Sequence, residues 1–102
     1  MTKITFQRSG GLLGQDIDID LDLDTLPANE ALNLLQMLHR CNFFRLPENL
    51  VAKSTPDEFQ YTIIVESGSS RHRIRTSDTG APESLRPLLN ELSTIAMVSQ
   101  VG

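Results

Sequence analysis

Three side chains in this sequence have types that could support catalysis or metal binding: His39, Cys41 and His72. His39 and Cys41 are two residues apart in a stretch with helical periodicity, so their side chains point about 200° away from each other. They do not form a metal pair, and the sequence contains neither CxxC nor HxxxH. A Cys–His nucleophilic pair would also need an orienting acid or an oxyanion site, and neither is visible. We therefore predict a buried Cys41, an inward-facing or edge His72, and no catalytic residue, metal site or cofactor.

A second candidate is the acidic pattern D-I-D-I-D-L-D-L-D at residues 16–24. Alternation with a period of two predicts a strand that carries its apolar residues on one face and its acids on the other. The acidic face consists of Asp16, Asp18, Asp20, Asp22 and Asp24. Calcium needs oxygens that converge from a curved loop, whereas alternate strand residues point in parallel, about 6.5–7 Å apart. We expect a solvated sheet face here rather than a cation site.

A basic cluster, Arg71, Arg73 and Arg75, alternates in the same way on another predicted strand. Three arginines on one face could hold phosphate or an acidic partner. We favour pairing with the aspartates of the same sheet, which would contribute about 0.2–1 kcal/mol per pair if the strands are adjacent. The alternative is that the two charged rows together guide a protein partner.

The glycine-rich segment S-G-G-L-L-G differs from a phosphate-binding loop because it joins two predicted strands rather than a strand and a helix. Its unusual feature is a pair of leucines at a hairpin tip. They either fold back onto the core or form an exposed apolar prong for a partner. The candidate partner-binding residues are therefore Ser9, Gly10, Gly11, Leu12, Leu13 and Gly14.

These candidates must be positioned by a small set of elements. Alternation predicts four strands, over residues 3–8, 16–24, 59–66 and 71–77. Helical spacing predicts one helix over about 28–42 and a second that starts near Glu83, with a loop over 47–58. The order ββαββα predicts an α+β fold, in which a four-stranded antiparallel sheet carries both helices on one face.

Length and composition exclude several classes of protein. A chain of 102 residues fits a single domain spanning residues 1–102. Its net charge of −4 argues against nucleic acid as a partner, since such proteins usually carry a basic excess. The N-terminus lacks the apolar core of a signal peptide, and no apolar run approaches the ~18–20 residues that cross a bilayer. With a single cysteine and hence no internal disulfide, we expect a cytoplasmic protein without membrane contact.

Three short motifs occur in order along the chain: R-S-G-G at residues 8–11, P-D-E-F-Q-Y at 56–61 and L-R-P-L-L at 85–89. In this order and spacing, the chain resembles the emfourin family of bacterial protease inhibitors from about residue 3 to 96. The resemblance implies a non-enzymatic, cytoplasmic inhibitor of thermolysin-like, protealysin-type zinc metalloproteases.

Such proteases favour a large apolar residue just after the scissile bond, so our hypothesis is that Leu12 or Leu13 fills that pocket. The alternative is a non-catalytic interaction domain without a protease target, such as a homodimer formed through a sheet edge or an open sheet face. The oligomeric state stays open at this point.

Overall fold

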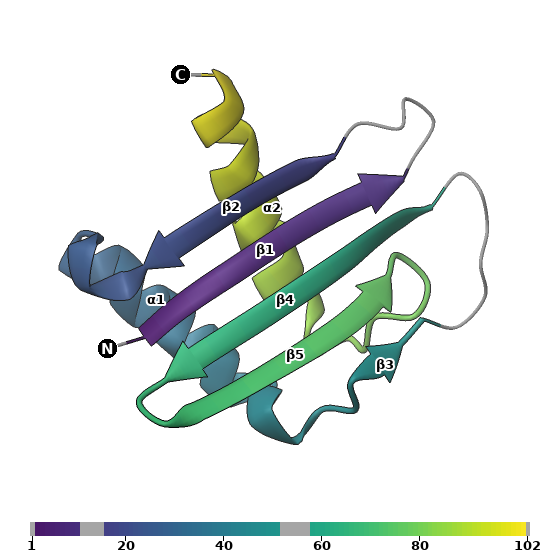
Figure 1. The fold of residues 1–102 in the computed structure, drawn as a ribbon, viewed down its shortest axis with the longest axis horizontal. Helices are drawn as coiled ribbons and strands as arrows, with labels where there is room; N and C mark the ends of the chain where they lie inside the picture. Colours follow the sequence, from purple (N-terminus) through teal and green to yellow (C-terminus); the bar gives the residue numbers. More distant parts are fainter. Residues whose placement is uncertain (1, 11–15, 52–57, 102) are drawn as a thin grey trace.

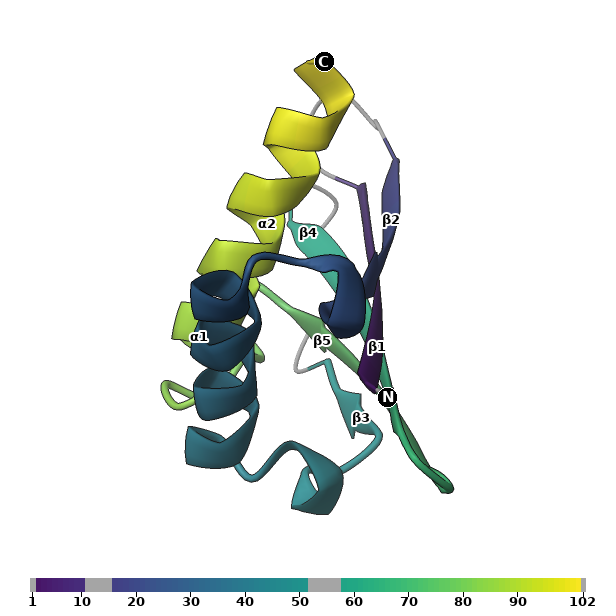
Figure 2. The same ribbon diagram turned by 90° about the vertical axis from the view of Figure 1, so that its left-hand side faces the viewer.

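The computed structural model describes residues 2–10, 16–51 and 58–101, which form a sheet with two helices on one of its faces (Figure 1). The turned view in Figure 2 separates the two layers. The strands are β1 (Thr2–Gly10), β2 (Ile17–Asp22), β3 (Asn49–Leu50), β4 (Phe59–Ser67) and β5 (Ser70–Ser77). The helices are α1 (Ala28–Arg40) and α2 (Arg86–Val101), with two 3₁₀ turns, η1 (Leu23–Thr25) and η2 (Phe43–Arg45).

The α+β class, both hairpins and the two helices are as predicted, but the four-stranded antiparallel sheet is wrong in one respect. The sheet has five strands in the order β2-β1-β4-β5-β3, and β3 pairs with β5 in parallel. Strand β3 lies inside the segment predicted to be a loop, and two residues are too short to show any periodicity. The backbone N–H of Arg75 donates to the Glu48 carbonyl at 2.7 Å, which fixes the start of this extra strand.

The second strand ends earlier than its alternation predicts, at Asp22 rather than Asp24. The Asp22 carboxylate accepts the backbone N–H of Asp24 at 3.0 Å and thereby caps the 3₁₀ turn η1. Aspartate side chains compete in this way with strand pairing. Leu23 is still buried, but Asp24 lies after the strand and Asp16 before it, so three aspartates remain on β2.

Helix α1 is shorter than predicted, and helix α2 starts later than predicted. Helix α1 ends before Asn42, which adopts a left-handed conformation with φ 51°. Helix α2 starts at Arg86 rather than near Glu83, which places Pro87 in its first turn. The missing N–H of Pro87 costs little there, because donors of the first turn have no partner within the helix.

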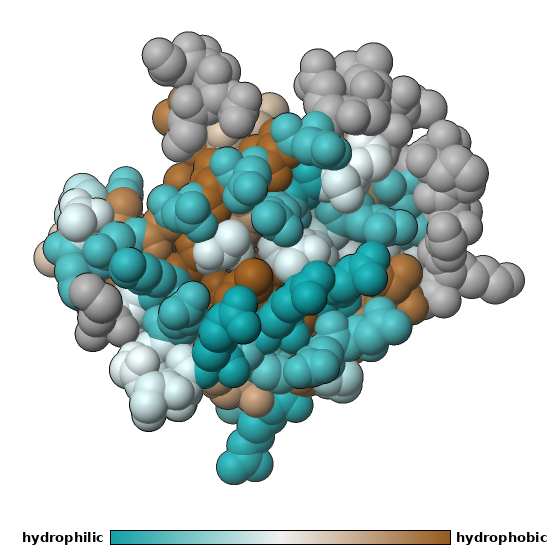
Figure 3. Space-filling model, viewed as in Figure 1, coloured by the Kyte–Doolittle hydropathy of each residue, from teal (hydrophilic) through white to brown (hydrophobic). Residues whose placement is uncertain are grey.

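The core lies between the helices and the inner face of the sheet. Fully buried side chains come from the strands, from both helices, from η2 and from the turn before α2: Ile4, Phe6, Leu34, Phe43, Ile63, Val65, Ile74, Leu85, Leu88 and Leu92. The opposite face is not covered by a helix, and Figure 3 shows it as mostly hydrophilic. None of the described helices is long and apolar enough to cross a bilayer.

Candidate protein-binding surfaces

The predicted partner-binding segment lies mostly outside the described residues. The structure places Ser9 and Gly10 at the end of β1, whereas Gly11, Leu12, Leu13 and Gly14 belong to the segment 11–15 that it does not describe. The described chain resumes at the exposed Asp16, directly before β2. At this end of the sheet, the described residues thus reach the base of the hairpin tip, at Gly10 and Asp16.

Gly10 is the last described residue before the tip, and only glycine fits its position. Its φ of +89° lies where side chains with a Cβ are strained, and a Cβ there would lie 2.7 Å from the Glu58 carbonyl oxygen. Gly10 is also the register partner of Phe59, the first residue of β4. The close approach of the two backbones fixes where the chain leaves β1.

A row of rings lies beneath this exit on the inner face. Phe59, Tyr61 and Phe6 follow one another, with ring centroids 6.4 and 6.0 Å apart. The Arg8 guanidinium lies over the Phe59 ring, 4.3 Å from its centroid. Because the ring face attracts the cation, Arg8 is held even though its Nε is buried and has no hydrogen-bond partner in the described part of the chain.

Asp78 joins the start of β4 to the end of β5. One carboxylate oxygen accepts the Tyr61 hydroxyl at 2.6 Å, and the other accepts the backbone N–H of Phe59 at 3.0 Å. Burial of the phenol raises the pKa of Tyr61, and the adjacent Asp78 carboxylate raises it further. A neighbouring bond, from the backbone N–H of Thr79 to the Glu58 carboxylate, closes the same corner. The base of the hairpin tip is thus fixed by polar contacts as well as by packing.

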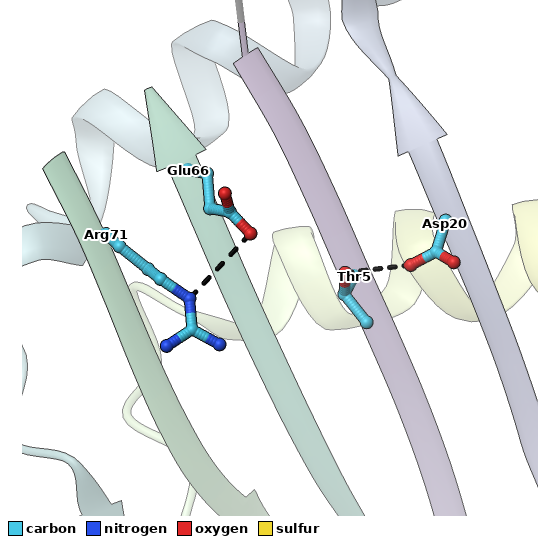
Figure 4. Close-up of polar contacts among 4 residues, drawn as sticks. All are labelled: Thr5, Asp20, Glu66 and Arg71. Carbon is cyan, nitrogen blue, oxygen red and sulfur yellow. Dashed lines mark hydrogen bonds and ion pairs between the residues drawn. The ribbon is translucent and has the colours of Figure 1, made fainter. Parts of the chain in front are cut away.

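The two charged rows do not pair with each other within the molecule, which corrects the expectation from the sequence. The aspartates lie on β2 and the arginines on β5, with β1 and β4 between them. Asp20 instead accepts the Thr5 hydroxyl at 2.8 Å, and Arg71 contacts Glu66 at 3.7 Å. Figure 4 shows both contacts on the same face of the sheet.

Two of the three side chains that could support catalysis, Cys41 and His72, take structural positions. Cys41 is buried, its thiol donates to the Leu38 carbonyl at 3.5 Å, and burial raises the pKa of that thiol. The His72 Nε2 lies 2.7 Å from the Leu46 carbonyl oxygen, and its ring meets Phe43 edge-on. His39 is exposed on α1. Among the described residues, no three His, Cys, Asp or Glu side chains come close enough to hold a metal ion.

An apolar groove that the sequence reasoning missed lies at the other end of the sheet. It has a volume of about 320 Å³ and is bounded by α1, η2, the start of β1 and the end of β4. Leu35 and Phe44 line it and are each 43% exposed, and His39 and Arg45 lie among the lining residues. The run F-F-R-L just after the first helix was the available signal, because it carries more apolar residues than a helix end needs.

Comparison with known proteins places the chain in a family. The family model described as Emfourin matches residues 6–93, which is most of the chain. Comparison with curated proteins and with solved structures gives no match. The chain therefore belongs to the emfourin family, as its three motifs indicated; this is a family of inhibitors rather than enzymes.

Proposed function

From membership of the emfourin family, we propose that this protein inhibits thermolysin-like, protealysin-type zinc metalloproteases by occupying their active-site cleft. The observation that carries the proposal is the family match over residues 6–93. An inhibitor of this kind contributes shape rather than reacting groups. The structural positions of Cys41 and His72 agree with such a role. We place its action in the bacterial cytoplasm, as the resemblance implies.

We further propose that residues 9–14 contact the protease. In this proposal Leu12 or Leu13 enters the apolar pocket that receives the residue after the scissile bond, and Ser9 and Gly10 form the rim. Support comes from the base of this segment, where Gly10 lies against the Glu58 backbone and Asp78 ties β4 to the end of β5. A segment that leaves a fixed base loses less conformational entropy on binding, so more of its contact energy appears as affinity.

The pairing of β1 with β2 supports an inhibitor rather than a substrate. Arg8 and Ile17 are register partners, so both sides of the tip are held by the same hairpin. If the protease cut the tip, the two new ends would stay next to each other, since each remains in the sheet. Release would then be slow, which favours inhibition over turnover.

The direct test mixes the purified protein with a thermolysin-like protease and follows cleavage of a short peptide. We expect cleavage to stop near equimolar inhibitor, and a serine protease assayed in parallel to stay fully active. Undiminished cleavage at about a tenfold molar excess of the chain would contradict the proposal, because that excess saturates any tight complex.

A further inference from the structure

The open face of the sheet carries two rows of opposite charge that match in spacing but cannot meet within one molecule. Asp18, Asp20 and Asp22 alternate along β2, and three arginines alternate along β5. The two strands are three strand spacings apart, about 14 Å, and both rows point away from the helices. Side chains that point in parallel over such a distance cannot form ion pairs with one another.

The register of the sheet aligns these residues across the four neighbouring strands β2, β1, β4 and β5. One crossing row contains Asp22, Lys3, Glu66 and Arg71. The next contains Asp20, Thr5, Ile64 and Arg73. The third contains Asp18, Gln7, Thr62 and Arg75. Each row begins with an acid on β2 and ends with a base on β5, and the first alternates in sign along its whole length.

A second copy can satisfy all three rows at once. A two-fold axis that runs along the strands, between β1 and β4, exchanges β2 with β5 and β1 with β4 while keeping each crossing row at its own level. Asp20 of one copy then faces Arg73 of the other, and Lys3 faces Glu66. A two-fold axis across the strands would instead set aspartates against aspartates, so electrostatics selects the first arrangement.

Sheet twist does not disturb this match. A twisted sheet has the shape of a saddle, and rotation by half a turn about an axis along its strands gives a saddle of the same shape and hand. Two such faces can stack at the ordinary separation of facing sheets, about 10 Å, with their strand directions within about 30° of each other. Figure 2 shows both described helices on the other side of the sheet, and Figure 3 shows this face as largely hydrophilic.

We propose that this protein forms a symmetric dimer through the open face of its sheet, in which the aspartates of β2 meet the arginines of β5 in the partner copy. The face holds charged and polar groups rather than a large apolar patch, so the dimer is salt-sensitive and reversible. This inference does not rest on protease inhibition. The dimer would use the charged face of the sheet, whereas the proposed protease contact uses residues 9–14.

The test is a charge-swap series followed by analytical ultracentrifugation. At low salt we expect the wild type to dimerise, with a dissociation constant that rises at least about tenfold in half-molar salt. Arg73→Asp sets two acids against each other in both symmetric contacts, and Asp20→Arg sets two bases against each other. Each single variant should weaken the dimer at least about tenfold. The double variant, with both changes in one chain, should restore dimerisation because the pair is re-formed with its charges exchanged.

A matched control is Arg40→Asp, which makes the same change of charge on the exposed end of α1, away from the open face. This control should dimerise like the wild type, and circular dichroism of every variant should match the wild-type spectrum. A wild type that stays monomeric at low salt overturns the proposal. A double variant that dimerises no better than the single variants also overturns it, since the contact would then not depend on this pair.

Discussion

The two ends of the central strands are built in different ways. At the end where β1 stops and β4 starts, Gly10 lies against the Glu58 backbone and Asp78 accepts hydrogen bonds from Phe59 and Tyr61. At the other end, Phe43 and Phe44 line an apolar groove, and the His72 ring packs against both of them. One end is fixed by directional polar contacts, and the other offers exposed apolar surface.

This difference indicates which end suits binding in one fixed orientation and which suits adaptable apolar binding. Hydrogen bonds and backbone contacts fix a position in space, because they tolerate little change in distance or angle. Apolar contacts in an open groove adapt to many partners, because the hydrophobic effect has no direction. A segment that must enter an enzyme cleft in one orientation needs a fixed base, which is why we propose residues 9–14 rather than the groove as the inhibitory contact.

The largest effect on stability should come from Gly10→Ala. The new Cβ would combine a strained φ with an approach of 2.7 Å to a backbone oxygen, so we expect a loss of more than ~2 kcal/mol in the free energy of unfolding. Gly68 is the matched control at the other end, since its φ is +61° and no atom lies within 4 Å of the added Cβ. Gly68→Ala should cost only ~1 kcal/mol. Urea denaturation of both variants measures the difference in their free energies of unfolding. Equal losses of stability would show that a Cβ close to the Glu58 carbonyl adds no cost at Gly10.

The next effect concerns inhibition itself. Replacing Leu12 and Leu13 together by Asp should raise the inhibition constant at least tenfold, or more than ~1.4 kcal/mol, because two charges would enter an apolar pocket. The matched control replaces Leu32 and Leu35 by Asp, which makes the same change on exposed positions of α1, beside the groove. If the control loses inhibition and the tip variant keeps it, the assignment of the two ends is reversed.

A pH-dependent effect on stability should appear at high pH. Tyr61 is the only tyrosine, and its raised pKa means that the folded protein keeps the phenol proton after the unfolded chain has lost it. The stabilisation is complete below the unfolded pKa of about 10 and decreases as the pH rises toward the folded pKa, by up to about 1.4 kcal/mol per pH unit.

Ultraviolet absorbance checks this point, because the chain has no tryptophan and the tyrosinate band reports Tyr61 alone. The folded protein should show almost no tyrosinate at a pH near 10, and unfolding by urea should produce the band. The alkaline decrease in stability that comes from the Tyr61 phenol should be absent in Tyr61→Phe. A normal titration near pH 10 in the folded state would mean that the phenol is neither buried nor bonded to Asp78 in solution.

The smallest effect should come from Phe44→Ala at the groove. Phe44 is 43% exposed and contacts its neighbours Phe43 and His72 through ring edges and faces, so its removal should cost less than ~1 kcal/mol. Protease inhibition should stay unchanged. Thermal melting and the same protease assay measure both quantities, and a marked loss of inhibition would give the groove a part in the complex.

Most elements of the fold could be predicted from the sequence because their patterns are local and long. The alternation of residues 16–24 and of residues 71–77 shows directly which side chains face the core. Strand β3 could not be predicted, because its two residues depend on an edge that β5 provides and not on their own pattern. The shortened β2 could not be predicted either, since the Asp22 cap competes with an alternation that continues through Asp24.

The candidate site divides in the same way. The glycines and leucines of residues 9–14 are visible in the sequence as an unusual hairpin connection. Asp78 and Tyr61, which fix the base of that connection, are 17 residues apart and carry no shared motif. Only the pairing of β4 with β5 brings them together.

The sequence by itself indicated a buried Cys41, the two charged rows and the glycine-rich connection, because each depends on residue type and short-range spacing. Tertiary structure alone decided the strand order. That order places two strands between the aspartates of β2 and the arginines of β5. The ion pairs expected between them within one molecule therefore do not form, and both rows face outward. The physical reason is that alternation fixes the face on which a side chain lies, whereas long-range strand pairing decides which side chains become neighbours.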